Sequence, residues 1–528
     1  MANHTSAFLA RYSIFTSPTE PRLDLPDGGD NDLRPRRLEL YVALGCVLLV
    51  AYFFQSYRDA KRRTVAVPFY KASLFKWMFD AETLVTDSYN KFYGKVYQIK
   101  ATEGVQVIIP PSLLDEIKGL PEEALSSTAA VAEAMMGKYT HFHLGKNTNL
   151  MSALIRTKLT QNVARMVPRM KEDIDHLVAA EFPPCDDWTA VKVSPFAVRS
   201  IVRVGGRAFV GPEVARDEGW AEASVGFCVH VFTAVVKLQL MPSWLRPLGQ
   251  YLVSDLAKIR RHMAAAKRLM RPVIEQRLRG LDTPGAERPD DLIQWLLEAL
   301  PERDRADVDA QVMLQLVLCA ASIHSSSNLL VEGVYDLADK PEVQAELRRE
   351  VEEVFAKGGW SKRDSIMNLK KMDSFMKEVQ RLRGNITGFI RKVVKPIDLS
   401  DGTHLPAGTK LLAPQAGMSQ DPRFYESPET FDALRFYKMR QRSDEDRNRW
   451  QFTSIESTNM NFGAGKHSCP GRFFAGTEIK MLLAYFLLHY DMKLKDGEQR
   501  PKGFVVMMSK GANPEGEIMF RRRECASY

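Results

Sequence analysis

One short stretch near the C-terminal end constrains the fold of this chain more than any other. It reads Phe462-Gly463-Ala464-Gly465-Lys466-His467-Ser468-Cys469-Pro470-Gly471, and it precedes an apolar run from Gly471 to His489 that we expect to be a helix. Its glycines let the backbone turn tightly and approach a large flat group. A thiolate that faces a helix N-terminus among basic side chains is stabilised as an anion. Cys469 is therefore a candidate nucleophile or metal ligand.

The surroundings of Cys469 narrow the choice of metal. The helix expected after it contains no paired Cys or His at zinc spacing, which argues against a structural zinc site. A single thiolate without protein partners suits a metal that brings its other ligands with it, as haem does. A buried, chemically inert Cys is the alternative for any cysteine taken alone.

The same stretch resembles the haem-binding signature of the cytochrome P-450 family, Phe-x-x-Gly-x-x-x-Cys-x-Gly. The matching positions are Phe462, Gly465, Cys469 and Gly471. Further motifs of the family occur upstream in its order and spacing, so the resemblance covers the chain from roughly Val65 to the C-terminus. It implies a mainly α-helical fold with small β-sheets (α+β), and a haem b whose iron takes Cys469 as its axial ligand.

A second motif lies in a predicted helix that opens at Leu369. Glu378 and Arg381 stand three residues apart, so they share one helix face and can pair. They match the family's Glu-x-x-Arg motif, which pairs with an Arg in a downstream loop; Arg435 matches that Arg. The resemblance implies a structural role for all three residues, whereas a solvated surface pair would contribute little.

Three cations match positions at which the family contacts the haem propionates. Arg391 lies ten residues after Arg381, and His467 lies two residues before Cys469. Arg156 matches the Arg of the family's Trp-x-x-x-Arg helix, although Ser152 occupies the Trp position. Buried carboxylates need cations, but each of these residues could also be an ordinary surface side chain.

The centre of a long apolar segment, Asp307 to about Leu337, is unusual for a buried helix. It reads Ala320-Ala321-Ser322-Ile323-His324-Ser325-Ser326-Ser327-Asn328. Small and polar residues in such a helix are costly unless they line a cavity or bond back to the helix. The segment aligns with the family's oxygen-activation motif but departs from it, with His324 at the acid and Ser325 at the key Thr. Ser325 can donate a hydrogen bond and His324 can relay protons; the alternative is a packed core histidine beside small packing serines.

The N-terminal part predicts a membrane anchor. We expect a polar tail at 1–37, a transmembrane helix at 38–57, a basic and proline-containing linker at 58–68, and a catalytic domain at 69–528. The stretch Leu40 to Phe54 has no charge, and basic clusters flank it on both sides, whereas core helices rarely carry basic clusters at both ends. The resemblance implies a single-pass protein of the endoplasmic reticulum membrane with a cytosolic catalytic domain.

Other parts of the chain give coarser expectations. Strands are predicted from Tyr97 to Ile109 and from Ile386 to Thr409, with a hairpin in Lys502 to Phe520 that turns around Ser509 to Pro514. Helical periodicity from Ser112 to about Met270 is expected to break at Pro183-Pro184 and at Gly205-Gly206.

Charge and cysteine usage exclude two classes of protein. The net charge of +8 is spread along the 528 residues without a basic block that indicates nucleic-acid binding. The six cysteines are far apart and contain no CxxC, which indicates free thiols rather than a disulfide framework.

Together these features predict a membrane-anchored haem-thiolate monooxygenase. Its expected partners are dioxygen, an NADPH-dependent cytochrome P-450 reductase that docks near Lys466 and Arg472, and a lipophilic substrate. The resemblance to fungal secondary-metabolism members suggests a terpenoid, polyketide or indole-type scaffold, with several oxidation steps possible. The departure at His324 and Ser325 leaves two alternatives: a haem-thiolate isomerase or dehydratase that needs no dioxygen, and a non-catalytic haem-binding membrane protein.

Overall fold

The computed structural model describes residues 65–524, apart from 144, 146, 287, 362 and 363, together with Gly45, Val47, Val50 and Phe54. Contacts divide the chain into two compact units, Met1–Thr64 and Val65–Tyr528. The predicted tail at 1–37 lies outside the described residues. So does the predicted transmembrane helix at 38–57, except for the four residues named above, which are helical.

The unit Val65–Tyr528 is mainly helical, as predicted. Its α-helices are α3 (Leu74–Phe79), α4 (Ala81–Lys91), α5 (Pro111–Ile117), α6 (Ser127–Ala134), α7 (Gly137–Thr140), α8 (Thr148–Leu154), α9 (Thr160–Glu181), α10 (Val193–Ser200), α11 (Gly206–Val210), α12 (Pro212–Arg216), α13 (Glu218–Gln239), α14 (Arg246–Gly249), α15 (Ser254–Leu281), α16 (Leu292–Ala299), α17 (Glu302–Arg305), α18 (Val308–Asp339), α19 (Pro341–Phe355), α20 (Ser365–Asn368), α21 (Lys370–Arg383), α22 (Gln415–Ser419), α23 (Arg435–Met439) and α24 (Arg472–His489). The short helical turns are η1 (Ile155–Leu159) and η2 (Ile201–Gly205), both π-helical, and η3 (Gln250–Leu252), η4 (Gly359–Ser361), η5 (Asp446–Asn448) and η6 (Gly465–His467), all 3₁₀.

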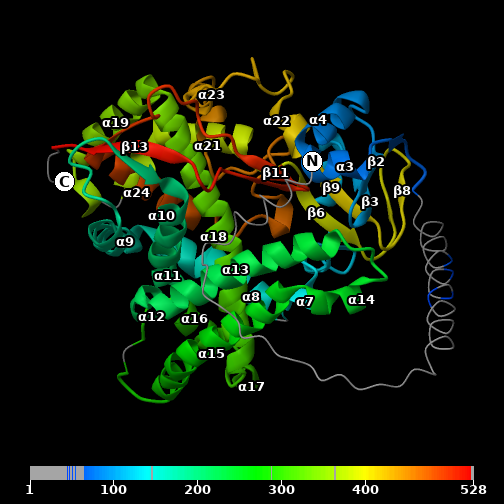
Figure 1. Ribbon diagram of the computed structural model, residues 1–528, viewed down its shortest axis with the longest axis horizontal. Coiled ribbons are helices and arrows are strands. Elements are labelled where there is room, and N and C mark those ends of the chain that lie inside the picture. Colours follow the sequence, from blue (N-terminus) through cyan, green and yellow to red (C-terminus); the bar gives the residue numbers. More distant parts are fainter. Residues whose placement is uncertain are drawn as a thin grey trace, which may run out of the picture. The chain divides into compact units, whose positions relative to one another are not determined.

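One mixed sheet gathers strands from both ends of the unit, beside α3 and α4 (Figure 1). Its spatial order is β1 (Phe69–Tyr70), β2 (Tyr97–Ala101), β3 (Gly104–Ile108), β9 (Lys410–Ala413), β6 (Gly388–Val393) and β4 (Leu125–Ser126). The predicted strand pair after Tyr97 is confirmed as the antiparallel hairpin β2–β3, in which Ala101 pairs with Gly104. This sheet brings β6, which carries Arg391, beside the segment that precedes α6.

The remaining strands form small sheets. They are β10 (Tyr490–Lys493), β13 (Glu517–Arg522) and β5 (Thr189–Lys192) in one sheet, β11 (Phe504–Val506) with β12 (Ser509–Gly511), and β7 (Ile397–Asp398) with β8 (His404–Leu405). The predicted C-terminal hairpin exists, but its predicted turn was wrong. The chain turns at Met507 and Met508, because Met507 adopts a positive φ of 53° and its amide donates to the carbonyl of Met78.

The helix α18 runs through the middle of the unit, with α13, α15, α10, α21 and α24 packed around it (Figure 1). Asp307 begins it as predicted, because its carboxylate caps the amide of Ala310 at 3.0 Å. The predicted break at Gly205-Gly206 was wrong: α10 continues through the π-turn η2 into α11. A π-turn absorbs an extra residue without ending the helix.

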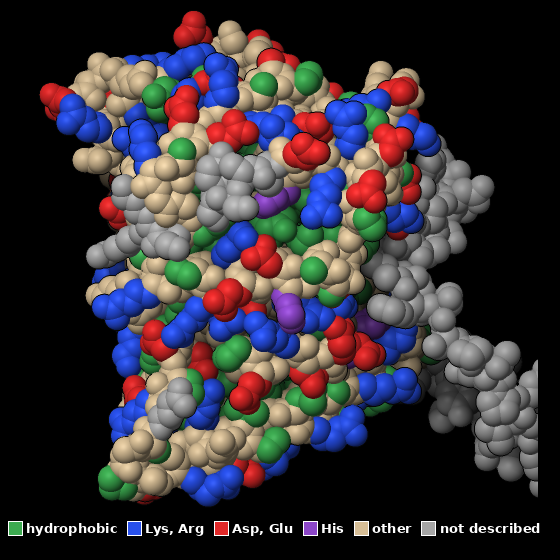
Figure 2. Space-filling model, turned by 90° about the vertical axis from the view of Figure 1, so that its left-hand side faces the viewer, with side chains coloured by type: hydrophobic (Ala, Val, Ile, Leu, Met, Phe, Trp, Pro, Cys, Tyr) green, Lys and Arg blue, Asp and Glu red, His purple; other side chains and the backbone are tan. Residues whose placement is uncertain are grey.

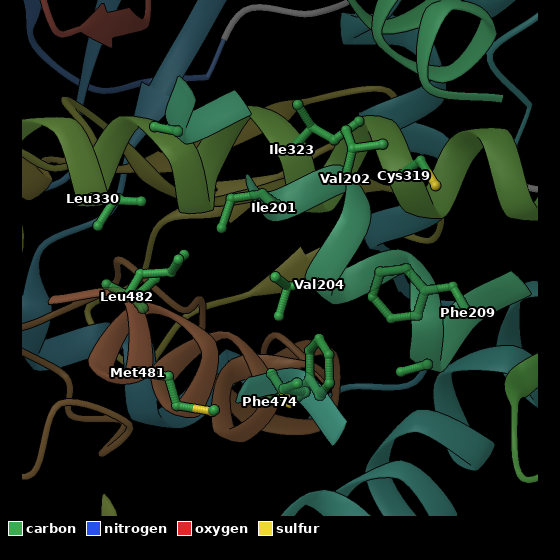
Figure 3. Close-up of a cluster of buried hydrophobic side chains, with 14 of the residues drawn as sticks. Ile201, Val202, Val204, Phe209, Cys319, Ile323, Leu330, Phe474, Met481 and Leu482 are labelled. Carbon is green, nitrogen blue, oxygen red and sulfur yellow. The ribbon is translucent and has the colours of Figure 1, made fainter. Parts of the chain in front are cut away.

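The apolar core around η2 ties α18 to α24. Figure 3 shows Ile201, Val202 and Val204 of η2 between side chains of these two helices. Cys319, Ile323 and Leu330 extend from α18, and Phe474, Met481 and Leu482 extend from α24. All of these side chains are buried. Fully burying each contributes about 1.5–3 kcal/mol, so the helix that follows Cys469 is held firmly.

Two described helices, α13 and α18, are long and apolar enough to cross a membrane. Half of the apolar window of α13 and two thirds of that of α18 are buried among other side chains. Core packing within the unit therefore accounts for much of their apolarity.

Candidate functional site

The loop from Phe462 to Gly471 is closed tightly around Cys469. The Cys469 amide donates to the carbonyl of Phe462 at 2.8 Å, and Phe462 packs edge-on against Phe452 at 5.1 Å between ring centroids. Gly463 and Gly465 both adopt positive φ angles, 71° and 62°. A Cβ on Gly465 would lie 2.0 Å from the carbonyl oxygen of Lys118, so only glycine fits there.

The electrostatics of Cys469 depend on two opposing effects. Burial raises the pKa of the thiol, while the amides of Gly471 and Arg472 hydrogen-bond to the sulfur and lower it. The positive charges of Arg472 and Arg156 act in the same direction as the amides. These amides lie at the start of α24, where the helix dipole favours an anion. Burial outweighs these contacts, so the pKa of the thiol is raised on balance. A bound metal cation would supply the positive charge that deprotonates the sulfur.

No group of three or more His, Cys, Asp or Glu side chains in the described part of the chain could hold a metal ion. Cys469 therefore belongs to no such group among these residues. A metal bound there has to bring its remaining ligands, and haem fits this requirement.

The three predicted propionate contacts converge on the Cys469 loop. Arg156, from η1, donates to the carbonyl of Lys466 at 2.9 Å. Arg391, from β6, donates to the carbonyl of Ala464 at 3.4 Å. His467 lies within the loop, and its Nε2 is buried without a hydrogen-bond partner among the described residues.

Arg391 is a buried cation in an unusual setting. Burial lowers its pKa to about 10, and it has no ion-pair partner within the described residues. Its guanidinium stacks at 4.5 Å on Phe389, which adopts a positive φ of 53° at a bulge in β6. A buried guanidinium with no carboxylate at ion-pair distance among the described residues, beside an orphaned imidazole nitrogen, fits a ligand that carries acidic groups.

Glu378, Arg381 and Arg435 form one buried ion cluster. Arg381 pairs with Glu378 through two hydrogen bonds of 2.8 and 2.7 Å, and Arg435 reaches the same carboxylate at 3.2 Å. Arg381 also donates to the carbonyls of Ser419 and Pro428. The cluster thereby fastens α21 to the segment that leads into α23, because both guanidinium groups also donate to the carbonyl of Thr430 in that segment.

Ser325 and His324 face different directions from the middle of α18. Ser325 is exposed, as is Ala321 one turn earlier, and its hydroxyl donates to the Ala321 carbonyl at 2.9 Å. His324 packs against Phe232 of α13 at 4.9 Å between ring centroids, and burial lowers its pKa. Consecutive helical residues diverge by about 100°, so the structure does not bring these two side chains together.

Ala321 and Ser325 form an exposed strip on the otherwise mostly buried helix α18. This strip supports the expectation that small residues line a space for a ligand. The serines also bond back to the helix, since Ser327 donates to the carbonyl of Ile323 at 2.6 Å. The helix α18 remains uninterrupted through this segment.

Two acidic residues, one beside His467 and one buried in α24, were not singled out from the sequence. Glu122 lies 3.3 Å from Nδ1 of His467. Glu478, on α24, is fully buried with both carboxyl oxygens unpaired, and burial raises its pKa well above the usual range despite the nearby Gly205 amide. No spacing in the sequence links Glu122 to His467, because 344 residues separate them. Glu478 could have been noticed as an acid in a strongly apolar helix.

Comparison with known proteins identifies relatives of this chain. The family model described as Cytochrome P-450 matches residues 73–515. A cytochrome P-450 monooxygenase of Emericella nidulans is 31% identical over 93% of this chain and 94% of its own length. The cytochrome P-450 monooxygenase braC of Annulohypoxylon truncatum is 32% identical over 85% of this chain and 89% of its own. An ent-kaurene oxidase of Gibberella intermedia is 29% identical over 92% of this chain and 93% of its own.

Proposed function

This chain belongs to the cytochrome P-450 family, and we propose that it is a membrane-anchored monooxygenase that hydroxylates or repeatedly oxidises a lipophilic secondary metabolite. Membership makes it an oxidoreductase with haem, held through a cysteine thiolate to iron. It also implies a reductase as redox partner, a small-molecule substrate and dioxygen. The observation that carries the proposal is the convergence of Cys469, Arg156, Arg391 and His467 on one loop.

We assign Cys469 as the thiolate ligand. The closed loop and the amides of Gly471 and Arg472 would hold its sulfur at the start of α24. Arg156, Arg391 and His467 would hold the propionates, which explains the buried guanidinium and the orphaned Nε2. Bound haem supplies the activation of dioxygen, which no side chain of the protein can provide.

The distal residues would handle protons. The Ser325 hydroxyl is exposed and donates only to its own helix, so its proton can be redirected to a ligand without leaving a buried group unpaired. Ser325 thereby supplies the donor that oxygen activation requires. A relay role for His324 remains a prediction; its packing against Phe232 would require it to act through an intervening group.

Electron delivery is proposed at the face that carries Lys466 and Arg472. Lys466 is exposed in the Cys469 loop, and Arg472 donates to the carbonyl of Cys469 at 2.9 Å. An acidic patch on an NADPH-dependent flavoprotein reductase would dock there by charge complementarity. The anchor at 38–57 would place both proteins at the endoplasmic reticulum membrane, with this unit in the cytosol.

A terpenoid, polyketide or indole-type substrate is proposed from the relatives, which include an ent-kaurene oxidase, and from the apolar tip of the β11–β12 hairpin. The test is to co-express the protein with a reductase and to analyse products from a panel of such scaffolds under heavy-isotope dioxygen. Incorporation of the label into a product supports monooxygenation. A product without the label, or one formed without NADPH, would move the assignment to an isomerase or dehydratase.

A further inference from the structure

The carboxylate of Glu122 connects the Cys469 loop to the start of α6. Its Oε1 lies 3.3 Å from Nδ1 of His467. The same oxygen accepts from the Ser127 amide at 3.0 Å, while Oε2 accepts from the Ser126 hydroxyl at 2.5 Å and from the Thr128 amide at 3.4 Å. One side chain therefore holds both the imidazole and the first residues of α6.

Arg391, on strand β6, also links the start of α6 to the Cys469 loop. Its Nη1 donates to the Ser127 hydroxyl at 3.3 Å and its Nη2 donates to the Ala464 carbonyl at 3.4 Å. The charge of Glu122 also acts on the buried guanidinium and stabilises its charged form. Glu122 thus acts on both Arg391 and His467, the two groups that we assign to the propionates on this side.

The contact with Glu122 fixes one edge of the His467 ring. Nδ1 faces the carboxylate, so Nε2 faces the opposite direction, where it is buried without a partner among the described residues. A fixed ring presents Nε2 at a defined position, which lowers the conformational entropy lost when a ligand binds there.

We propose that Glu122 is a positioning residue for the haem: it orients His467 through Nδ1, and its negative charge sets the field in which the iron is reduced. The inference rests on the proposed haem site. A fixed carboxylate favours the more positively charged, oxidised state of a nearby centre, and the effect is strong where water is excluded. Glu122 therefore lowers the reduction potential and steadies the propionate contacts.

The test uses Glu122→Gln, which keeps the size of the side chain and removes its charge. Its control is Glu123→Gln, which removes the same charge from the adjacent, exposed side chain. The midpoint reduction potential of the purified, substrate-free protein is measured by spectroelectrochemical titration, and haem loss is measured by transfer to apomyoglobin. We expect Glu122→Gln to have a more positive potential and faster haem loss, while Glu123→Gln matches the wild type.

Equal potentials in Glu122→Gln and Glu123→Gln would overturn the proposal. If Glu122→Gln does not fold, Glu122→Asp replaces it, because its shorter side chain withdraws the charge from His467 and should shift the potential in the same direction; an unchanged potential then overturns the proposal. Failure of the proposed function is distinguishable, since the wild type itself would then lack a thiolate-type carbonyl spectrum.

Discussion

The Ser325 hydroxyl is the polar group on the exposed strip of α18 that can deliver a proton. Its bond to the Ala321 carbonyl lies within the helix and can be exchanged at little cost. We expect Ser325→Ala to uncouple NADPH consumption from product, with release of hydrogen peroxide and a drop in product per NADPH on the order of tenfold or more. Stoichiometry of NADPH, peroxide and product measures this.

The control for that variant lies on the same helix. Ser327 is buried and donates to the Ile323 carbonyl, so Ser327→Ala removes a hydroxyl of the same kind from a different face. Its coupling should match that of the wild type. Unchanged coupling in Ser325→Ala would show that protons reach the reaction by another route.

Glu478 is predicted to make stability depend on pH. Burial raises its pKa in the folded state, so the folded protein keeps a proton that the unfolded chain releases above its ordinary pKa. The stability associated with the neutral acid is fully present below about pH 4.5 and is lost as the pH rises toward the folded-state pKa. Glu478→Gln removes this loss.

The free energy of unfolding of Glu478→Gln, relative to the wild type, should therefore increase by up to about 1.4 kcal/mol per pH unit between about pH 5 and pH 7. Denaturant titrations of both proteins across this range measure the difference. A difference that is constant with pH would mean that Glu478 is ionised in the folded protein.

The sequence predicts chemistry at the level of single residues better than it predicts contacts. Motif positions predicted Cys469 together with Arg156, Arg391 and His467, and the structure brings these four residues to one loop. Their roles at a haem stay a prediction. The partner of His467 could not be identified, because Glu122 reaches it through the fold rather than through a spacing. Helix geometry alone predicts that the side chains of His324 and Ser325 diverge. Which of the two packs against another helix depends on the position of α13.

At the scale of the element, the Cys469 loop depends on two glycines that differ in their surroundings. Both adopt a positive φ, so an alanine at either position costs on the order of 1 kcal/mol in backbone strain. A Cβ at Gly463 meets nothing closer than 3.5 Å, whereas a Cβ at Gly465 meets the Lys118 carbonyl at 2.0 Å. An alanine therefore has to displace the loop at position 465 but not at position 463.

We therefore expect Gly465→Ala to purify with much less haem than the wild type, while Gly463→Ala retains most of it. The ratio of haem absorbance to protein absorbance in the purified variants measures this occupancy. Equal haem content in the two variants would contradict the view that contact with Lys118 fixes the loop.

Elements with strong periodicity were predicted well, and short irregular ones were not. The helices α18 and α24 begin within a residue of their predicted starts, because a capping Asp and a glycine loop mark them. The turn of the C-terminal hairpin was misplaced, because Met507 holds a left-handed conformation that its residue type does not signal. The π-turn η2 was read as a break, because paired glycines usually end helices.

At the scale of the whole molecule, charge is distributed rather than concentrated. Figure 2 shows Lys and Arg interspersed with Asp and Glu over one face of the molecule. The net charge of +8 therefore does not come from a single basic field on this face.

Deletion of residues 1–57 tests the anchor. Contacts separate Met1–Thr64 from the unit Val65–Tyr528, so we expect the truncated protein to fold and to keep its haem. It should move from the carbonate-washed membrane pellet toward the soluble fraction, because the uncharged stretch that a bilayer would accommodate is gone. Full retention in the washed pellet would place the membrane contact within the remaining unit.

The central claim is that Cys469 supplies a thiolate ligand to haem iron, and the reduced carbonyl difference spectrum tests it most directly. The wild type should show the thiolate-type spectrum, and Cys469→Ala should lose it. The matched control is Cys228→Ala, which removes a buried thiol from α13 and should retain the spectrum. A thiolate-type spectrum in Cys469→Ala would contradict the assignment and require another ligand.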